Sequence, residues 1–309
     1  MYKNTVVLLL LLLSAGNARA WFSEGHMMVA EIAWQSLTAA SRARVSVLLR
    51  RNPDHDLWVR GVPADRRDEI AFVTAATWPD AIKGSEGHAL EYTNDGERPR
   101  GPDAGRNTGY QDRLQHRYWH FVDTPFSTDG TALEPPATPN AETQIRTFEA
   151  AIASRDVGED VKSYDLVWLE HLVGDVHQPL HAASRFSRSL RRGDRGGNAV
   201  MLCRRPCRNE LHLFWDGIPG DSDDPREAIE AARKLARPDA RAAAIGDEHV
   251  WIEESFAVAK RYAYEAPIGP GSGPYALDGR YENDARAQAM QRIALAGVRL
   301  ANLINANLR

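Results

Sequence analysis

The 309-residue sequence has no apolar run long enough to cross a membrane. Its longest such run, residues 6–13, follows Lys3 and precedes Ala18-Arg19-Ala20, which is the pattern of a signal peptide and its cleavage site. A membrane-spanning helix needs about 20 apolar residues, which argues against a retained anchor. We predict that residues 1–20 are a signal peptide, that residues 21–309 form the mature domain, and that the protein is secreted or periplasmic.

Cysteine is scarce, with only Cys203 and Cys207 in the whole chain. Three residues separate them, so they do not form the C-x2-C knuckle of a zinc-binding loop. In an exported protein, two neighbouring cysteines are typical of a local disulfide that closes a loop. The sequence therefore predicts a Cys203–Cys207 disulfide, whereas a pair of free thiols would require a reducing compartment.

A basic tail or long basic run is also absent. Once Lys3 and Arg19 leave with the signal peptide, 36 basic residues stand against 42 acidic ones. This balance excludes tight binding of duplex nucleic acid through charge alone, so a nucleic-acid site would need metal ions for its positive charge. The chain also lacks a P-loop, a dinucleotide-binding fingerprint and a serine nucleophile elbow.

Histidine and aspartate, by contrast, are concentrated in residues 164–181. An apolar run predicts a buried helix there, on which His171 and Asp175 share one face because they are four residues apart. Pro179 ends that helix, and His181 then follows on a segment that can turn back toward the same face. Two imidazoles and a carboxylate converging on one point are typical of zinc sites, although ordinary core histidines are the alternative for an isolated motif.

A second H-x3-D motif, His212 and Asp216, repeats this spacing and favours another metal-facing element. His26 lies in the first turn of a predicted helix, close to Trp21, whose amine and carbonyl can chelate a metal after signal cleavage. Three further polar residues stand in motifs of their own: Asp80 after Pro79, and His120 and Asp123 within an aromatic run. The alternatives are a surface role for His26, a helix-dipole role for Asp80 and a core role for His120.

The remaining pattern predicts a mostly helical protein whose 289 mature residues suffice for one large core. Helices are expected at residues 25–37, 41–51, 141–154, 224–236, 247–264 and 282–307. Loops are expected at residues 91–115, as a long polar insertion, and at the proline-rich residues 124–140. Residues 199–202 and 210–214 are expected to pair as a short hairpin around the cysteines.

In combination these motifs resemble the zinc-dependent single-strand nucleases of the S1/P1 type. The similarity runs through the mature chain in order: W-x4-H at 21–26, W-x-D-x-x-K at 78–83, HFVD at 120–123, H-x3-D-x-H-QPLH at 171–181, GGN at 196–198 and LH-x-x-WD at 211–216. The resemblance implies a mostly α, single-domain fold of the phospholipase C/P1 nuclease type with a short β-hairpin. It also implies three zinc ions as cofactors.

The resemblance further implies a role for each matching residue. Asp80, His120, His171 and Asp175 would hold one zinc ion; His181, His212 and Asp216 would hold the second; and the Trp21 amine and carbonyl, His26 and bridging Asp175 would hold the third. Lys83 would contact phosphate, Phe121 would stack on a base, and Asp123 would contact a base edge. Asp80, Asp175 and Lys83 would carry catalysis, in which a hydroxide that bridges two ions attacks phosphorus in line.

The implied activity is hydrolysis of single-stranded DNA and RNA to 5′-nucleotides, together with 3′-nucleotidase activity. The implied protein is a monomer without a stable protein partner. Two alternatives are a zinc-dependent phospholipase C of the same fold and an exported, non-enzymatic zinc-binding or adhesion protein.

Some residues depart from the family pattern or match no ligand position. Residues 184–189, where a second aromatic wall for the base is expected, contain only Phe186. We expect His177 to be structural, and we expect four other histidines to lie on the surface: His55, His88, His116 and His249.

Overall fold

The computed structural model describes residues 21–84, 87–203 and 209–308. Over these residues the chain is mostly helical, with two small two-stranded sheets. Within the same residues, every helix is too short or too polar to cross a lipid bilayer. The proposed signal peptide and Cys207 lie outside the described residues, so the cleavage site and the disulfide remain predictions.

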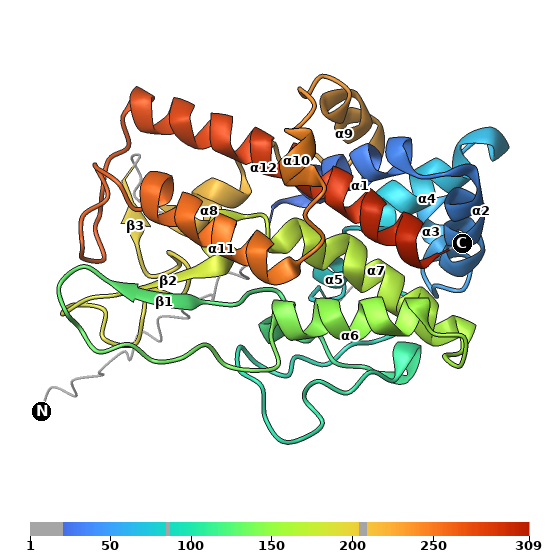
Figure 1. Cartoon of the computed structure of the whole chain (residues 1–309), viewed down its shortest axis with the longest axis horizontal. Helices are drawn as coiled ribbons and strands as arrows, with labels where there is room; N and C mark the ends of the chain where they lie inside the picture. The colour runs from blue at the N-terminus through green and yellow to red at the C-terminus, as the bar shows by residue number, and fades with distance from the viewer. Residues whose placement is uncertain (1–20, 85–86, 204–208, 309) are drawn as a thin grey trace, which may run out of the picture.

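Helix α7 (Glu159–Asp175) forms the centre of the molecule. Glu159 and Asp160 occupy its first turn, where their negative charge complements the helix dipole. Residues 162–175 are all buried, which is the pattern of a helix enclosed on every side. In Figure 1, α6 (Ala141–Ala153) lies below α7, while α1 (Ser23–Ser36) and α12 (Gly279–Asn307) lie above it.

Local sequence accounts for the ends of these helices. Asn140 caps α6 through a reciprocal pair of hydrogen bonds with Thr143, and Asp278 caps α12 by accepting from the amide of Tyr281. The helices outside this central group are α2 (Ala39–Leu49), α3 (His55–Trp58), α4 (Arg67–Ala75), α5 (Trp78–Ala81), α8 (Leu211–Asp216), α9 (Pro225–Ala232), α10 (Ala240–Ala243) and α11 (Glu248–Val258).

Gly297 allows the first and last helices to pack closely. A Cβ atom at this position would lie 2.5 Å from the Cβ of Ile32 and 2.8 Å from the carbonyl oxygen of Val29, both on α1. Any larger residue would force α12 away from α1. The N-terminal and C-terminal parts of the described chain are therefore held together in one core.

The prediction that the whole proline-rich segment 124–140 is a loop was wrong. Its first residues form β1 (Thr124–Ser127), which pairs in parallel with β2 (Ala183–Phe186), Thr124 lying opposite Ala183. Parallel strands need a long crossover connection, which α6 and α7 supply here. The hydrogen-bonding partner of β1 is thus distant in sequence, and local patterning did not reveal it.

The predicted hairpin is shorter than expected. It consists of β3 (Met201–Leu202) and β4 (Asn209–Glu210), and the chain then turns at once into α8. The prediction that residues 211–214 form a strand was wrong, because these residues begin the helix that carries the second H-x3-D motif. Helix α9 also ends at Ala232, earlier than predicted, and α11 continues as a π-helical turn, η5 (Ala259–Ala263).

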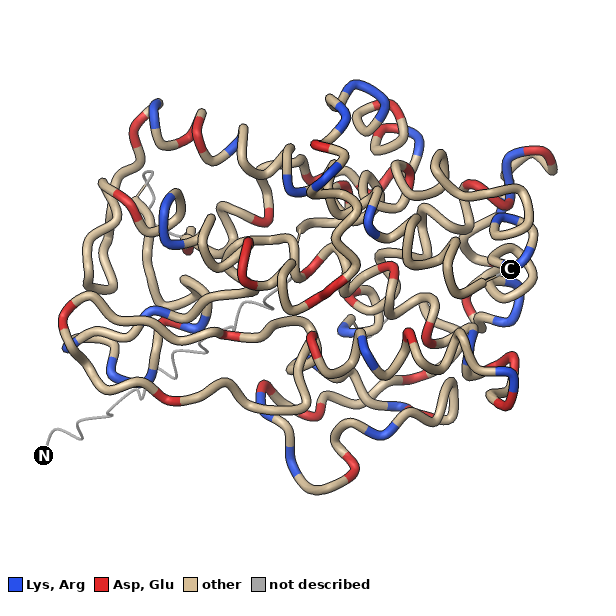
Figure 2. Tube along the Cα trace, in the orientation of Figure 1, with Lys and Arg blue, Asp and Glu red and all other residues tan. Residues whose placement is uncertain are grey.

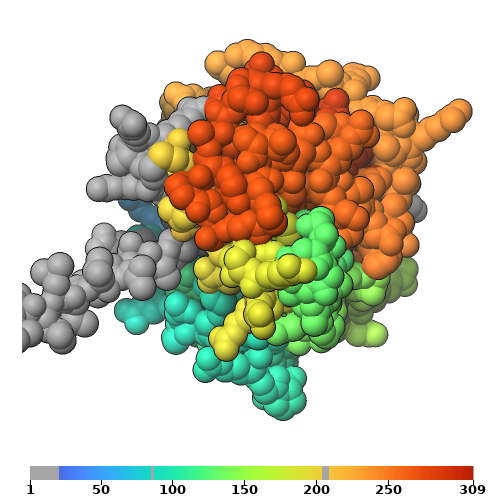
Figure 3. Space-filling view, turned by 90° about the vertical axis from the view of Figure 1, so that its left-hand side faces the viewer, coloured from blue at the N-terminus to red at the C-terminus, as the bar shows by residue number. Residues whose placement is uncertain are grey.

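Charge and exposure vary over the surface. Figure 2 shows positive and negative positions interspersed over most elements. Figure 3, which views the left-hand side of Figure 1, shows the yellow segment that follows β2 at the surface, between the green β1 region and the orange C-terminal elements.

Candidate metal centre

Histidine and aspartate side chains from six separate segments converge at the C-terminal end of α7. They form three buried groups whose potential ligand atoms lie within 4.8 Å of one another: His26, Asp80 and His171; His120, His171 and Asp175; and His181, His212 and Asp216. His171 belongs to two of the groups, so the first two adjoin. All nine side-chain and backbone ligand positions predicted from the sequence are buried, including Trp21.

The first cluster is built on the last turn of α7. Nε2 of His171 lies 3.3 Å from Oδ2 of Asp175, as their four-residue spacing on the helix predicts. Nδ1 of His120 lies 2.9 Å from the same carboxylate oxygen and 2.9 Å from Nε2 of His171. Oδ1 of Asp80 lies 3.7 Å from Nε2 of His171. Four potential ligand atoms therefore face one another across a few ångströms.

His26 reaches the same region from the first turns of α1. Its ring stacks on that of His171, with centroids 3.9 Å apart and an interplanar angle of 15°. Its Nε2 lies 3.4 Å from Oδ1 of Asp175. A Cβ atom on Gly174 would stand only 2.8 Å from Nδ1 of His26, so the absence of a side chain there makes room for the imidazole.

The second cluster combines the chain reversal after α7 with α8. His181 lies in the short helix η4 (Pro179–Ala182), which follows the break at Pro179. Nε2 of His212 lies 3.1 Å from Nε2 of His181 and 3.5 Å from Oδ2 of Asp216. Because α8 is a helix, His212 and Asp216 share one face in the same way as His171 and Asp175.

Backbone carbonyl groups fix the orientation of three imidazoles. Nδ1 of His171 donates to the carbonyl oxygen of Ala76 at 2.8 Å. Nδ1 of His181 donates to the carbonyl oxygen of His120 at 2.6 Å. Nδ1 of His212 donates to the carbonyl oxygen of Gly196 at 2.6 Å. A hydrogen bond at Nδ1 leaves Nε2 with its lone pair directed inward, which is the usual arrangement of zinc-binding histidines. These carbonyl groups were not foreseen from the sequence, because they carry no side-chain signature.

The charge state of the groups suits metal cations. Burial lowers the pKa of His26 and of His171 to about 4, so both rings are neutral and able to bind metal at physiological pH. Burial raises the pKa of Asp175 and of Asp216 above the usual carboxyl range. Oδ1 of Asp175, Oδ2 of Asp216 and both ring nitrogens of His26 have no hydrogen-bond partner in the described part of the chain. When they are ionised, these buried carboxylates need a positive charge close by, which zinc ions would provide.

Asp80 has a positive partner of its own. Nζ of Lys83 lies 2.5 Å from Oδ1 of Asp80, and both residues are buried. Burial acts to raise the pKa of Asp80, but the positive charge of Lys83 is the strongest of the effects that oppose burial, and the pKa lies below the usual range. Pro79 lies in the first turn of α5, where its missing N–H has no helical partner to lose.

The two residues predicted to contact a base lie beside the second cluster. The amide of Val122, between Phe121 and Asp123, donates to the carbonyl oxygen of His181 at 2.8 Å. Phe121 and Asp123 are both partly exposed. Asp123 adopts a left-handed conformation with φ of 57°, and burial, together with the nearby charge of Asp194, raises its pKa to about 7. Phe186, the expected second wall, is buried within β2 instead.

Comparison with known proteins decides the family. The protein-family model described as S1/P1 Nuclease matches residues 21–309 of this chain. The chain belongs to the S1/P1 nuclease family. Its curated relatives include Endonuclease 1 of Arabidopsis thaliana, 26% identical over 325 residues that cover 96% of this chain and 90% of that protein. Endonuclease 2 of the same plant is 23% identical over 318 residues, covering 97% and 94% of the two chains.

Membership of the S1/P1 family makes this protein a nuclease, which hydrolyses phosphodiester bonds in nucleic acid. Family membership decides against the two alternatives that the sequence left open, a lipid-cleaving enzyme and a non-enzymatic zinc-binding protein. The mostly helical fold with small sheets is also the one that the resemblance implied. The three buried histidine and aspartate groups are consistent with the family's multi-metal site.

The first described residues of this S1/P1 nuclease lie against the second cluster. The amide of Phe22 donates to the carbonyl oxygen of Asp216 at 3.0 Å. Trp21 itself is fully buried, and a Cβ atom on Gly25 would lie 2.5 Å from its Cβ. The backbone of Trp21 is thus tied to a segment that carries a proposed ligand.

His177 supports the turn between the two clusters. Its Nδ1 donates to the carbonyl oxygen of Val173 at 2.7 Å, and its Nε2 accepts from Nη1 of Arg299 at 3.0 Å. Arg299 in turn pairs with Glu254, and Arg292 bonds the carbonyl oxygen of His177. Glu254 of α11 and the buried Arg292 and Arg299 of α12 therefore hold the segment from Asp175 to His181 in place.

Four other histidines were predicted to lie on the surface. The prediction was wrong for His116 and holds only in part for His55 and His88, which are partly buried. His116 is fully buried, stacked on Trp119 at 3.4 Å between centroids, and its Nε2 lies 2.8 Å from Asp112. His88 is partly buried and bridges Asp54, at 2.7 Å, and the carbonyl oxygen of Ala81, at 2.9 Å, which steadies α5. His55 is also partly buried, whereas His249 is exposed as predicted. The carboxylate partners lie outside any recognisable motif.

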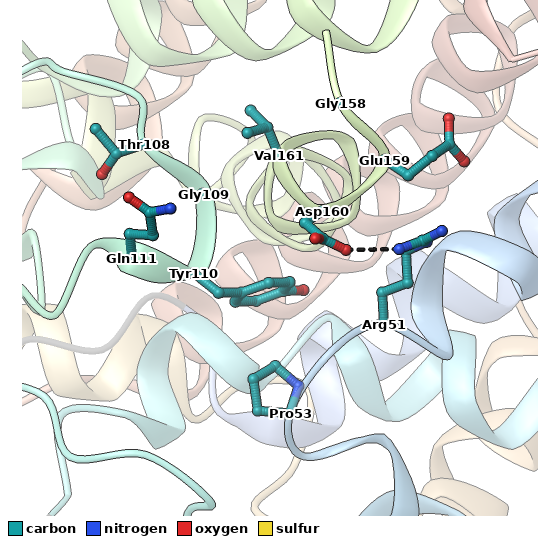
Figure 4. A pocket seen from close by; sticks show the side chains of 10 residues that line it. All are labelled: Arg51, Pro53, Thr108, Gly109, Tyr110, Gln111, Gly158, Glu159, Asp160 and Val161. Atoms are coloured by element: carbon teal, nitrogen blue, oxygen red, sulfur yellow. Dashed lines mark hydrogen bonds and ion pairs between the residues drawn. The ribbon is translucent and has the colours of Figure 1, made fainter.

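A surface pocket of about 500 Å³ is lined partly by the first residues of α7, whereas the clusters lie at the C-terminal end of that helix. Figure 4 shows the side chains that line the pocket. Tyr110 from the insertion and Asp160 at the start of α7 line it, and Arg51 pairs with Asp160 at 2.7 Å. None of its lining residues belongs to the motifs shared with the family. The pocket therefore has no part in the proposed chemistry.

Proposed function

We propose that this protein is an exported endonuclease that uses three zinc ions to hydrolyse single-stranded DNA and RNA to 5′-nucleotides, with 3′-nucleotidase activity at the same site. The observation that carries the proposal is the set of three buried histidine and aspartate groups in a chain of the S1/P1 family. The names of two plant relatives, both endonucleases, support cleavage within a strand.

The donor set fits zinc in number and kind. Asp80, His120, His171 and Asp175 would hold one ion, and His181, His212 and Asp216 a second. Trp21, His26 and a shared Asp175 would hold the third. When bound, zinc supplies Lewis-acid chemistry, which makes water a better nucleophile near neutral pH and neutralises charge on a phosphoryl group.

The chain's own polar residues then orient the substrate. Lys83 is held by Asp80 at the edge of the first cluster, where its ammonium group would pair with an oxygen of the scissile phosphate. Asp80 keeps the ammonium group in position and stays ionised because of it. This arrangement places positive charge where the phosphate gains negative charge during the reaction.

Phe121 and Asp123 would select unpaired bases. A base must leave its helix before its face can stack on an aromatic ring, and such stacking tolerates every base. Phe121 would provide that ring, and Asp123 would hydrogen-bond the base edge. The backbone bond from Val122 to His181 fixes both residues beside the second cluster.

We further propose that export and activity are linked through Trp21. Cleavage after Ala20 would free the amine of Trp21 next to the ligands of α8, where it would complete the third site. The mature protein would be secreted or periplasmic, act as a monomer and contain the Cys203–Cys207 disulfide.

One joint measurement tests the proposal: zinc content of the purified mature protein, and release of nucleotides from single-stranded DNA and RNA before and after chelation. We expect three zinc ions per chain, release of nucleotides with a 5′-phosphate, and loss of release on chelation with recovery after zinc is restored. Zinc at this stoichiometry without nucleotide release would refute the substrate. Nucleotide release by a protein that retains no zinc would refute the cofactor.

A further inference from the structure

The connection between β2 and β3 is rich in arginine. Residues 184–195 contain five arginines and one aspartate, although the whole chain has a formal net charge of −4. Arg185 is buried, but the four others are exposed: Arg188, Arg191, Arg192 and Arg195. Residues 187–195 are called the arginine loop below. Figure 2 shows positive positions gathered below β1 at the left-hand end of the molecule.

The arginine loop has a fixed backbone. Ser187 and Leu190 exchange two backbone hydrogen bonds of 3.2 and 2.9 Å, and the amide of Arg188 donates to Asp129 at 2.9 Å. At the other end, the buried carboxylate of Asp194 accepts from the amide of Arg185 at 2.9 Å and from Tyr264 at 3.1 Å. The loop therefore presents its arginines from a stable support, which lowers the entropy lost on binding.

The arginine loop adjoins the metal centre. Gly196, the next residue, accepts the 2.6 Å hydrogen bond from Nδ1 of His212. A Cβ atom on Gly196 would lie 2.3 Å from the carbonyl oxygen of Leu180, beside His181. The guanidinium group of Arg195 also lies close enough to Asp123 to counteract the rise in the pKa of that carboxyl. A strand that enters the centre would therefore pass close to the loop.

The exposed arginines of the loop differ from many other surface arginines in their ion pairing. Over the described residues, none of the four forms an ion pair, whereas many other surface arginines do, such as Arg44 with Glu159. Unpaired guanidinium groups on a fixed support favour phosphate, which they bind through two parallel hydrogen bonds. In a protein of negative net charge, such a local patch would also attract a polyanion to the centre.

We propose that the arginine loop binds the phosphate backbone of single-stranded nucleic acid outside the scissile position, and so favours long strands over small phosphodiesters. The proposal rests on the proposed function, since it places a backbone site beside that nuclease centre. The residues that act are Arg188, Arg191 and Arg192, with Arg195 nearest to Asp123.

The test compares two triple variants of equal charge. In one, Arg188, Arg191 and Arg192 are changed to Gln. In the control, three exposed arginines that form no ion pair in the described structure and lie on other elements are changed to Gln: Arg60, Arg237 and Arg241. KM and kcat are measured for a long oligothymidylate and for bis(p-nitrophenyl) phosphate between about 50 and 200 mM salt.

We expect the loop variant to raise KM for oligothymidylate about tenfold at the lowest salt and to reduce the slope of log KM against log salt by about two. That reduction corresponds to three lost contacts, at about 0.7 per phosphate on a single strand. KM for the small phosphodiester should change less than about twofold, since it makes no outer contact. The control variant should leave both values close to those of the natural protein.

Equal changes in the two variants would overturn the proposal, because net charge and not the loop would then be responsible. Unchanged kinetics in the loop variant would also overturn it. Arg191→Glu, a single reversal of charge, replaces the triple variant if that variant does not fold.

If the natural protein cleaves neither substrate, the proposed function fails, and the loop is tested instead by fluorescence anisotropy of labelled oligothymidylate. Weaker binding by the loop variant alone then supports the proposal, and equal binding overturns it.

Discussion

Gly174 offers a direct test of the position of His26. A Cβ atom at Gly174 would stand 2.8 Å from Nδ1 and 3.1 Å from Cε1 of His26. The imidazole is fully buried and stacks on His171, so it has no open space into which to move. The change Gly174→Ala therefore places a methyl group against a proposed zinc ligand without removing any ligand.

The size of the effect follows from these distances. Ordinary van der Waals contact begins at 3.4 Å, so the ring and the methyl group must separate by about 0.6 Å. Zinc–ligand distances tolerate about 0.2 Å, which is far less. We expect Gly174→Ala to lose the zinc ion bound by His26 and to lower the free energy of unfolding by about 1–3 kcal/mol through overpacking.

The assay combines zinc per chain by elemental analysis, nucleotide release from single-stranded DNA, and urea unfolding. Gly246→Ala is the control, because a Cβ atom there would meet no other atom within 4 Å. The control should keep three zinc ions and full turnover. If Gly174→Ala also keeps three zinc ions at natural turnover, His26 is not a ligand in the arrangement described.

Three further predictions concern the chain start and the base site. A mature protein with one extra residue before Trp21 should lose most of its third zinc ion and its turnover, since the chelating amine moves; both are measured as above. Phe121→Ala should raise KM for nucleotides by about fivefold, the lower end of one lost stacking contact, and hardly affect bis(p-nitrophenyl) phosphate. The pKa of Asp123, raised to about 7, means that its carboxyl donates a hydrogen bond below that pH and only accepts above it. The ratio of kcat/KM for a nucleotide to that for the base-free substrate should therefore change near pH 7, and Asp123→Asn should abolish the change.

Each of these predictions has a result that contradicts it. Full zinc content in the extended protein would remove the terminal chelate. Equal effects of Phe121→Ala on both substrates would point to a disturbed centre and not to stacking. A pH step that persists in Asp123→Asn would belong to another group, because the asparagine side chain does not titrate.

The sequence predicted most of the side chains that converge at the candidate site, because these residues occur in short-range patterns. His171 and Asp175 share a helix face through their spacing alone, and Pro179 marks the turn that brings His181 back. His212 and Asp216 were found by the repeat of that spacing, although the segment was expected to be a strand. Residues four apart also share a face in a strand, but they lie about 13 Å apart there, whereas in a helix they are neighbours. Convergence of His212 and Asp216 on one metal ion therefore favoured a helix over the predicted strand.

Other features depend on contacts that are distant in the sequence. The parallel pairing of β1 with β2 joins segments on either side of α6 and α7, and neither segment shows its partner. His116 was predicted to lie on the surface, but its ring lies in the core, where it pairs with Asp112 and stacks on Trp119. Burial of a polar side chain is set by partners supplied elsewhere in the fold, which periodicity does not record.

The support of His177 by Arg299 determines when the centre can form during synthesis. The turn from Asp175 to His181 rests on residues of α11 and α12, and α1, which carries His26, packs on α12 at Gly297. The proposed ligands emerge early and midway along the chain, yet the helix that fixes them comes last. A growing or truncated chain would therefore hold the ligands without their geometry. The nuclease would become active only after the whole chain, including α12, has been synthesised.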